Sequence, residues 1–495
     1  MRMMRLQDIT LRDAQQCLWA TRMTTQEMTP IAETMDAAGF SVIDLTGGAA
    51  IDSAMMYLGE DPFERIRILS KLIKNTPLNF NTRGQSIFRW MQYADDVTDF
   101  TLDVMHRNGI RSIMVFDCLN DMRNLEHSVK VGKRLNMNII GAITYTISPV
   151  HTDEHFMEKT RELVDMGCNA IQIKDPSGIL TPERARDLIP KLREVAAGRE
   201  LHLHSHCTFG HGLDTYLEAL KLGEQGVDVM HCASQPLSSG YSLPAHVDIL
   251  EQLAANGYTT NVDPACIAEM DAYFGMVARR SGRPTGPSFP VQPLDIGHQV
   301  PGGMMSNLIR QLTDQGQQHR LQEVLDEVTQ VRIDLGYPIM VSPMAQYIGT
   351  QAVLNVLSGK RYQMVPQEVK QYVLGYYGKV VGEIDPVVRE KIAGDDPGID
   401  VPPGRLIEPM MPAYRKELAP YGSEEDLALR IFYSGKVVEE NRQARIQVGK
   451  WTHATNAAAL LAKELLGKKG LEICEVRKKD FYFSLNNQEQ QTEAA

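Results

Sequence analysis

The sequence predicts an α/β protein in which a (β/α)8 barrel, or TIM barrel, is followed by a mainly helical C-terminal domain. Three observations predict this fold. Short apolar runs typical of buried strands recur through the first 233 residues. Each run is followed by a polar turn and by a segment with helical start signals. Beyond residue 300, helical periodicity dominates.

The predicted strands are eight in number and alternate with predicted helices. They lie at residues 5–10, 41–45, 78–82, 112–117, 138–145, 170–174, 200–206 and 227–233. Eight such units over about 250 residues are typical of a closed barrel. Because the chemistry of this fold lies at the carboxyl ends of the strands, the residues that end them are the first candidates for a site.

Several predicted helices begin at recognisable capping residues. Thr24 is followed three residues later by Glu27, which is the pattern of a capping box. Asp61 and Thr181 each precede a proline, which favours an N-cap followed by the first helical position. Glycines stand where helices are expected to end, at Gly39, Gly109, Gly167 and Gly226.

We expect three parts in the chain: a barrel domain at 1–280, a helical domain at 300–440 and a small extension at 441–495. A Gly- and Pro-rich link at 281–299 separates the first two parts. Within the helical domain, the apolar periodicity is clearest at 321–335 and 342–357.

The extension changes composition along its length. We expect an Ala- and Leu-rich helix at 454–466, a strand-like segment with basic residues at 471–485 and a polar, disordered tail at 486–495. A docking element for a partner subunit and a solvated terminal extension both fit this composition.

Composition narrows the range of functions. The chain has 495 residues and a net charge of −11, and its Lys and Arg residues are scattered, so nucleic acid and anionic membranes are not expected partners. No apolar run is long enough to span a bilayer and no signal-peptide core is found, which predicts a cytoplasmic protein. The seven cysteines form no CxxC pair, as is typical of reduced thiols.

A run of alternating histidines is the strongest chemical signal. His202, His204 and His206 occupy alternate positions of the predicted strand at 200–206, so their side chains share one face. Two imidazoles spaced in this way at the end of a strand can hold one metal ion. Histidines that only pack or hydrogen-bond inside a barrel would give the same pattern.

Other predicted strands end in charged residues, namely Asp13, Arg83, Asp117 and Lys174. Simpler roles fit the first three. Asp13 could pair with Arg12 at a helix start. Arg83 could form a salt bridge at the barrel rim, and Asp117 could accept hydrogen bonds at its strand end.

Lys174 is harder to explain by structure alone, because lysine is rarely buried without a function. Desolvation lowers the pKa of a buried lysine, and the neutral amine can react with a carbonyl group or with CO2. A carbamylated lysine has negatively charged oxygen atoms that bind hard metals. With Asp13, His204 and His206 it would complete an N2O2 ligand set suited to zinc or a similar divalent ion.

Motifs along most of the chain support one family. They are TLRDAQQ at 10–16, ATRM at 20–23, GGA at 47–49, RGQ at 83–85, VFDCLND at 115–121, SPVHT at 148–152, IKD at 173–175, LHSH at 203–206, PGGM at 301–304, GTQAV at 349–353 and LGYYG at 374–378. In these motifs the chain resembles the carboxyltransferase component of biotin-dependent enzymes. That component occurs in pyruvate carboxylase, the oxaloacetate decarboxylase alpha subunit and the transcarboxylase 5S subunit. The resemblance fades after about residue 426.

The resemblance implies an enzyme, a metal-dependent carboxyltransferase. It would move a carboxyl group between carboxybiotin and a 2-oxo acid of the pyruvate or oxaloacetate type, through an enolate. Asp13, Lys174 as a carbamate, His204 and His206 would be the metal ligands. The metal would be zinc, or cobalt or manganese.

The resemblance also implies how the substrates are held. Gln16 and Arg83 would hold the carboxylate and carbonyl of the 2-oxo acid, and Asp117 is a further candidate catalytic residue. The helical domain would form a funnel over the barrel mouth that admits the biotin arm.

Several residues depart from the family pattern. The chain has Gln15 where the family has His, Thr46 where it has Trp, and Pro176-Ser177 where it has Met-Ala. The family's proton-shuttling Thr aligns with Tyr241, and Ser242 is the nearest other hydroxyl. A tyrosine at this position could relay a proton or could block the biotin.

Biotin is expected in trans. The chain has no Met-Lys-Met biotinylation motif, so the resemblance implies a separate biotin carboxyl carrier protein and a biotin carboxylase subunit as partners. It also implies a homodimer or a larger complex.

Two alternatives stay open. Aldolase- or Claisen-type metal barrels share the Thr-Leu-Arg-Asp and His-x-His signals, but they do not need the lysine ligand and lack the Pro-Gly-Gly-Met region. A degenerate subunit that keeps the metal and organises a carboxylase complex without catalysis is suggested by Thr46 and Tyr241.

Overall fold

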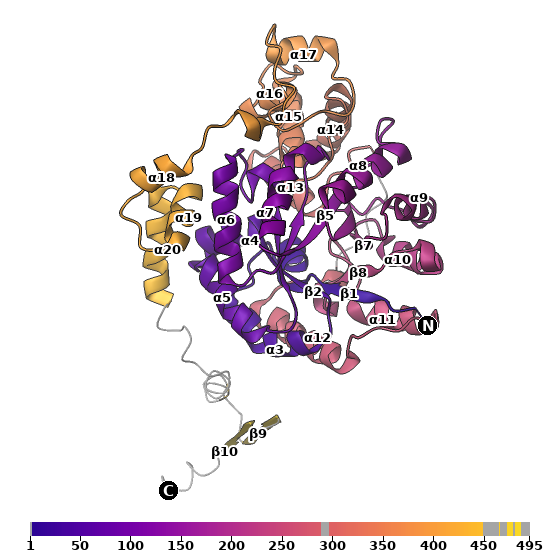
Figure 1. The fold of residues 1–495 in the computed structure, drawn as a ribbon, viewed down its shortest axis with the longest axis vertical. Helices are drawn as coiled ribbons and strands as arrows, with labels where there is room; N and C mark the ends of the chain where they lie inside the picture. The colour runs from indigo at the N-terminus through magenta and orange to yellow at the C-terminus, as the bar shows by residue number, and fades with distance from the viewer. Residues whose placement is uncertain (1, 289–296, 449–464, 466–472, 479–480, 487–495) are drawn as a thin grey trace.

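The predicted barrel is confirmed by the computed structural model, which describes residues 2–288, 297–448, 465, 473–478 and 481–486. Eight parallel strands close in chain order, with β8 beside β1 (Figure 1). They are β1 (Arg5–Asp8), β2 (Val42–Gly47), β3 (Leu78–Thr82), β4 (Ser112–Val115), β5 (Asn138–Thr144), β6 (Ala170–Asp175), β7 (Glu200–Ser205) and β8 (Val229–Cys232). Each begins and ends within two residues of its predicted position.

Helices alternate with these strands and surround the barrel. They are α1 (Gln15–Leu18), α2 (Thr25–Met28), α3 (Ala32–Ala37), α4 (Gly48–Ser53), α5 (Pro62–Leu72), α6 (Asp95–Asn108), α7 (Glu126–Arg134), α8 (Asp153–Met166), α9 (Pro182–Val195), α10 (Gly212–Lys221), α11 (His246–Ala255) and α12 (Pro264–Ser281). The predicted caps form: Thr24 and Glu27 make a capping box, and Thr181 accepts a hydrogen bond from the backbone of Arg184.

The strands separate an apolar outside from a polar inside. On β7, Leu201 and Leu203 belong to the main apolar cluster between strands and helices. His202 and His204 alternate with them and bond to other side chains inside the barrel. The barrel interior of this chain is therefore built to hold polar groups as well as to pack.

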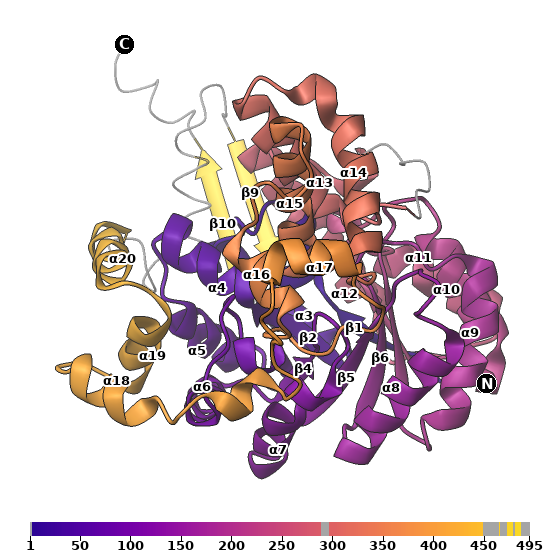
Figure 2. The same cartoon turned by 90° about the horizontal axis from the view of Figure 1, so that it is seen from above.

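The predicted helical C-terminal domain is also confirmed. Its first part consists of α13 (Gly302–Asp314), α14 (Leu321–Asp334), α15 (Met344–Ser358), α16 (Gln367–Val373) and α17 (Pro386–Ala393), which Figures 1 and 2 show as one group against the barrel. A second apolar cluster joins these helices to Phe116, Cys118 and Leu119, just after β4. The amide of Asn124 also donates to the carbonyl of Tyr377 at 3.1 Å. The helices therefore lie over the carboxyl end of the barrel at this strand.

The chain then returns to the flank of the barrel through α18 (Met411–Glu417), α19 (Glu424–Phe432) and α20 (Gly435–Val448). Figure 1 shows these helices beside α5 and α6. The hydroxyl of Tyr433 donates to Asp52 at 2.6 Å, and the amide of Asn441 donates to the carbonyl of Met55 at 3.1 Å. The predicted domain boundary at 440 falls inside α20.

Two further strands, β9 (Ile473–Lys478) and β10 (Phe481–Asn486), pair antiparallel, so the described residues of the segment predicted as strand-like at 471–485 do form strands. The helix predicted at 454–466 and the tail predicted at 486–495 lie outside the described residues, apart from residues 465 and 486. None of the described helices is both long and apolar enough to cross a membrane.

Candidate active site

The turn after β1 places Asp13 inside the mouth of the barrel. Thr10–Ala14 form one π-helical turn, and all five residues are buried. Arg12 donates to Asp13 Oδ2 at 2.9 Å and to Asp44 Oδ2 at 2.7 Å. Burial alone would raise the pKa of Asp13, but Arg12 and His204 outweigh it and hold that pKa well below its ordinary value. Asp13 is therefore a buried anion.

Arg12 is held in place by Asp44, which is itself held by two asparagine side chains. Asp44 on β2 accepts from Asn79 at 3.0 Å and from Asn81 at 3.1 Å, and Asn79 also donates to Asn81 at 2.7 Å. The two asparagines alternate along β3, so both face the interior. Because Asp44 holds the guanidinium of Arg12, the network also fixes the orientation of Asp13.

His204 and His206 converge on the Asp13 carboxylate. Asp13 Oδ2 lies 3.0 Å from His204 Nε2 and 3.9 Å from His206 Nε2, and the two Nε2 atoms are 3.2 Å apart. Burial lowers the pKa of His204 to about 3 and also lowers that of His206, so both rings are neutral and each has one nitrogen lone pair. Two neutral imidazoles and one carboxylate oxygen at this spacing fit a divalent metal.

Lys174 stands beside these groups. It is the sheet partner of His204 across β6 and β7, and it is 6 % exposed. Its amine lies 5.6 Å above the ring centre of Phe116. Burial lowers its pKa, which favours the neutral amine that can react with CO2. Of the four side chains predicted as metal ligands, Asp13, His204 and His206 thus meet directly, and Lys174 stands on the neighbouring strand, where its charge acts on Asp13 and His204.

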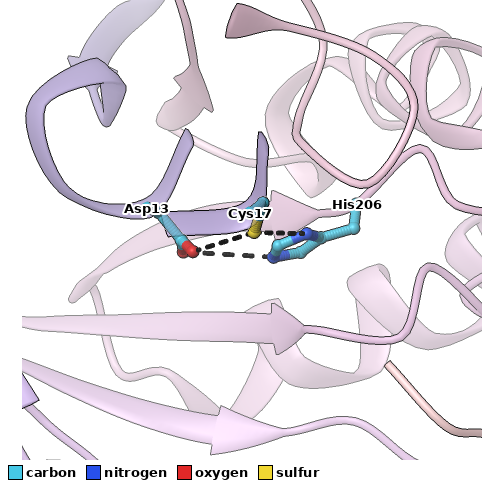
Figure 3. Close-up of side chains that lie close together, drawn as sticks. All are labelled: Asp13, Cys17 and His206. Atoms are coloured by element: carbon cyan, nitrogen blue, oxygen red, sulfur yellow. Dashed lines mark hydrogen bonds and ion pairs between the residues drawn. The ribbon is translucent and has the colours of Figure 1, made fainter. Parts of the chain in front are cut away.

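Cys17 is a member of the cluster that the sequence analysis did not identify. Figure 3 shows its thiol pointing toward Asp13 and His206, 3.6 Å from Asp13 Oδ1 and 4.0 Å from His206 Nδ1. These three side chains form a group compact enough for a metal ion. Burial and the charge of Asp13 raise the pKa of Cys17 well above its ordinary value, so the thiol stays protonated and donates to the carboxylate.

Arg83 lies at the end of β3 with part of its guanidinium unused. Its Nη2 donates to the carbonyl of Phe88 at 2.7 Å, and the guanidinium lies 4.9 Å above the ring of Trp90. Its Nη1 is buried and has no hydrogen-bond partner among the described residues. A Cβ at Gly48 would lie 2.5 Å from Arg83 Nη2 and 2.8 Å from the backbone oxygen of Phe88, and because the backbone cannot easily move, this position needs glycine. The free donor is suited to an anionic ligand.

The neighbouring glutamines differ in their surroundings. Gln15 is fully buried, where it donates to the carbonyl of Leu11 at 3.2 Å and accepts from the amide of Met23 at 3.1 Å. It therefore braces the turn after β1. Gln16 is only half-buried.

The other departures from the family pattern lie around the mouth. Thr46 is buried at the irregular step in the pairing of β2 with β3. The hydroxyl of Ser177, next to Pro176, donates to the carbonyl of Gln299 at 2.9 Å and so ties the loop after β6 to the start of the helical domain.

Tyr241 and Ser242 follow β8 and lie against the histidine pair. The backbone carbonyl of Tyr241 is 2.7 Å from His206 Nδ1, which fixes the orientation of that ring. Its side chain is half-buried, and burial raises its pKa. Ser242 is fully buried, its carbonyl accepts from Cys207 at 2.7 Å, and its hydroxyl has no partner among the described residues.

Asp117 uses its carboxylate within its own loop. Oδ2 accepts from the amides of Leu119 at 2.8 Å and Asp121 at 3.0 Å, and Oδ1 accepts from Asn124 at 3.0 Å. Burial and the nearby charge of Asp121 raise the pKa of Asp117 to about 7. The same Asn124 bonds to the helical domain, so the arrangement supports a role in shaping this loop.

Comparison with known proteins agrees with this geometry. Residues 3–232 match a family described as HMGL-like, and residues 296–480 match the conserved carboxylase domain. A pyruvate carboxylase subunit of Methanocaldococcus jannaschii is 41% identical over 437 residues, covering 87% of this chain and 76% of that protein. The chain belongs to the carboxyltransferase family of biotin-dependent carboxylases.

Two further members of this family support the assignment. The methylmalonyl-CoA carboxyltransferase 5S subunit of Propionibacterium freudenreichii is 36% identical over 85% of this chain and 84% of that protein. The carboxyl transferase domain of Rhizobium etli pyruvate carboxylase, solved with oxamate and biotin, superposes with a TM-score of 0.82 at 27% identity, covering 90% of this chain and 78% of that one. The predicted family and enzyme class are therefore confirmed.

Proposed function

We propose that this chain is a metal-dependent carboxyltransferase subunit that transfers a carboxyl group between carboxybiotin and a 2-oxo acid of the pyruvate type. The observation that carries the proposal is the convergence of Asp13, His204 and His206 within 3.9 Å, with Lys174 beside His204. The match at 296–480 to a carboxylase domain favours this activity over an aldolase- or Claisen-type reaction, which needs only the barrel.

The four side chains fit the metal that the family implies. Asp13 supplies oxygen, the two histidines supply nitrogen, and a carbamate on Lys174 would add a second oxygen ligand. A bound divalent ion supplies a Lewis acid that polarises the carbonyl of the 2-oxo acid. Loading experiments decide whether the native metal is zinc, cobalt or manganese.

The chain's own residues orient the substrate. We assign the substrate carboxylate to Arg83 Nη1, which has no partner among the described residues, and we assign Gln16, on α1, as a second substrate-binding residue. Oxamate, the ligand in the related Rhizobium etli structure, is a carboxylate of the same kind. Burial of Arg83 strengthens this contact, because a charge-assisted hydrogen bond gains strength away from water.

Proton transfer is assigned to Tyr241. In the carboxylation direction, the N–CO2 bond of carboxybiotin breaks, the biotin nitrogen takes up a proton, and the methyl carbon of the 2-oxo acid loses a proton and bonds to CO2. Tyr241 can pass that proton from carbon to nitrogen through its hydroxyl, because its side chain is half-buried. Ser242 is fully buried, so its hydroxyl is the less accessible of the two.

We further propose a biotinylated carrier protein and a biotin carboxylase subunit as partners, with biotin supplied in trans. The relatives named above include components of multi-subunit enzymes, the Methanocaldococcus pyruvate carboxylase subunit and the Propionibacterium 5S subunit. A homodimer or larger complex stays a prediction.

The test is an exchange assay with purified full-length chain. Zinc-loaded and metal-free protein are supplied with a carboxybiotinylated carrier and a panel of 2-oxo acids, and transfer of labelled carboxyl is followed. We expect transfer that needs both the metal and a 2-oxo acid. A chain that binds metal but gives no transfer to any oxo acid or acyl acceptor would support the alternative of a non-catalytic organising subunit.

A further inference from the structure

Three histidines form a continuous hydrogen-bonded chain inside the barrel. His204 Nδ1 lies 3.1 Å from His231 Nδ1, and His231 Nε2 lies 3.1 Å from His202 Nδ1. All three side chains are at most 2 % exposed. His231, on β8, has no part in the proposed reaction, and that reaction gives no role to the hydrogen bonds that join the three histidines.

The chain leads away from the reaction site toward the opposite end of the barrel. His204 lies near the carboxyl end of β7, His202 lies two residues earlier, and Glu200 begins the strand. His202 Nε2 is 3.6 Å from Glu200 Oε2, which is just beyond direct hydrogen-bond distance, so the carboxylate faces this ring nitrogen. Glu200 also pairs with Arg5 at 2.8 Å. A carboxylate thus stands at each end of the chain, Asp13 at one and Glu200 at the other.

Such a chain has only two arrangements of its protons. A neutral imidazole has one N–H and one lone pair, and each contact between two rings needs one of each. All three rings are buried within the barrel, and burial disfavours the charged form of an imidazole. In one arrangement His204 donates from Nδ1 and its Nε2 lone pair faces Asp13 and His206. In the other, His204 Nε2 holds the proton and donates to Asp13.

We propose that metal binding reverses this chain and that Glu200 stabilises the reversed, metal-competent arrangement. A metal on His204 Nε2 needs the lone pair there, so Nδ1 of that ring must hold the proton. His231 then donates from Nε2 to His202, and His202 directs its Nε2 proton to Glu200. One proton leaves at His204 Nε2 and one arrives at His202 Nε2, so the charge of the three rings is unchanged. This inference rests on the proposed metal site.

The roles are those of positioning residues, because His231, His202 and Glu200 do not touch the substrate. Residues that hold metal-ligating histidines commonly contribute about 10- to 100-fold to metal affinity. We therefore expect the metal affinity to depend on a hydrogen-bond acceptor at the position of His231 Nδ1. We also expect it to depend on a carboxylate at residue 200, although that residue does not touch the metal.

The role of the three histidines is tested by the zinc affinity of the metal-free, full-length protein. This affinity is measured by competition with a fluorescent chelator. His231→Leu removes the acceptor and should weaken binding about 10- to 100-fold. His231→Asn places an amide oxygen near the former Nδ1 and should recover most of that affinity. Glu200→Gln should weaken binding about tenfold. Glu218→Gln, on the outer helix α10, removes a carboxylate that pairs with Arg186 and Lys221, and it should bind zinc like the unchanged protein.

A second measurement follows the protons directly. Nitrogen NMR of protein labelled at histidine distinguishes the two tautomers, and zinc should move the protons of His202 and His231 from Nδ1 to Nε2. Zinc binding without that change, or His231→Leu with unaltered affinity, would overturn this inference and leave the proposed function intact. Failure of the unchanged protein to bind zinc would overturn both.

Discussion

Lys174 and His204 are paired residues on neighbouring strands, β6 and β7. The pairing puts the two residues at the same height in the barrel, and burial together with the charge of a protonated Lys174 lowers the pKa of His204. A carbamate reverses this charge. A protonated Lys174 repels a metal cation, whereas the carbamate carries negative oxygen atoms that can bind one. Lys174 can therefore act as a metal ligand only after it has reacted with CO2.

Lys174→Arg tests this role, since a guanidinium stays charged and cannot form the carbamate. In the unchanged protein, zinc affinity should fall when bicarbonate and CO2 are stripped from the buffer and should return when bicarbonate is added. The Arg variant should bind zinc weakly in both buffers. Lys133→Arg, on the outer helix α7, serves as the control and should follow the unchanged protein. Full zinc affinity in Lys174→Ala would instead favour the aldolase-type alternative.

Arg83→Lys tests substrate binding. A lysine keeps the charge but loses the planar, two-pronged contact with a carboxylate, and charge-assisted hydrogen bonds of this kind contribute about 1.5–3 kcal/mol. We expect KM for the 2-oxo acid to rise about 10- to 100-fold, with zinc affinity unchanged. Arg89→Lys is the matched control in the same loop, because Arg89 pairs with Asp52 instead. An equal rise in KM for both variants would mean that the loop, not Arg83, binds the substrate.

Gly48→Ala should reproduce the effect of Arg83→Lys without altering any charge. The added Cβ would lie 2.5 Å from Arg83 Nη2 and 2.8 Å from the carbonyl of Phe88, so the guanidinium must move. We expect a rise in KM for the 2-oxo acid, measured in the same assay. A KM equal to that of the unchanged protein would show that the observed position of Arg83 is not the one used in binding.

The sequence predicted the barrel and the meeting of its strand ends, because alternation along strands and the closure of eight βα units are local and repetitive. It did not predict the supports of the site. Asn79 and Asn81 hold Asp44, which in turn accepts from Arg12, and only the closed barrel shows that these residues meet. The sequence did contain one sign of these supports: Asn79 and Asn81 are two polar residues on the same face of a buried strand. A lone Cys17 or His231 offered none, since each acquires its partners only through neighbours distant in the sequence.

Tyr241→Phe tests the proton transfer. Tyr241 contacts His206 through its backbone carbonyl, which the substitution keeps, so removal of the hydroxyl should leave zinc affinity unchanged. We expect kcat for carboxyl transfer to fall about 100-fold or more, as is usual on loss of a group that transfers a proton. Ser242→Ala should retain activity. A loss in Ser242→Ala with full activity in Tyr241→Phe would assign the transfer to the serine.

Cys17→Ser asks whether the thiol binds the metal. Because its pKa is raised and it donates to Asp13, we expect cobalt-loaded protein to lack the strong sulfur-to-cobalt absorption of a thiolate ligand. The serine variant, which keeps a donor to Asp13, should give the same cobalt spectrum and affinity. A thiolate band that disappears in Cys17→Ser would make Cys17 a ligand.

Asp117→Asn gives a prediction about stability and pH. Burial, with the charge of Asp121, raises the pKa of Asp117 to about 7 in the folded chain, against about 4 when unfolded. The folded chain therefore holds one extra proton between about pH 4 and 7. The contribution of this group to stability falls as pH rises through that window, by on the order of 4 kcal/mol in all. It is fully favourable only below about pH 4.

Asparagine cannot ionise, so Asp117→Asn should remove this pH dependence. Its oxygen can still accept from Leu119 and Asp121. Asn124 must then turn its amide and lose its bond to Tyr377, at a cost of about 1 kcal/mol. Relative to the unchanged protein, the variant should gain stability steadily as pH rises from about 4 to about 7 in chemical denaturation.

Asp36→Asn should behave in the opposite way. Burial opposes ionisation of Asp36, but backbone amides including those of Lys74 and Thr76 outweigh it and lower the pKa, so its carboxylate stabilises the fold above about pH 4 and loses that effect as pH falls. This variant should therefore be least stable, relative to the unchanged protein, at the higher pH. If the stability of both variants, relative to the unchanged protein, changed in the same direction with pH, the raised pKa of Asp117 could not be the cause of the change in Asp117→Asn.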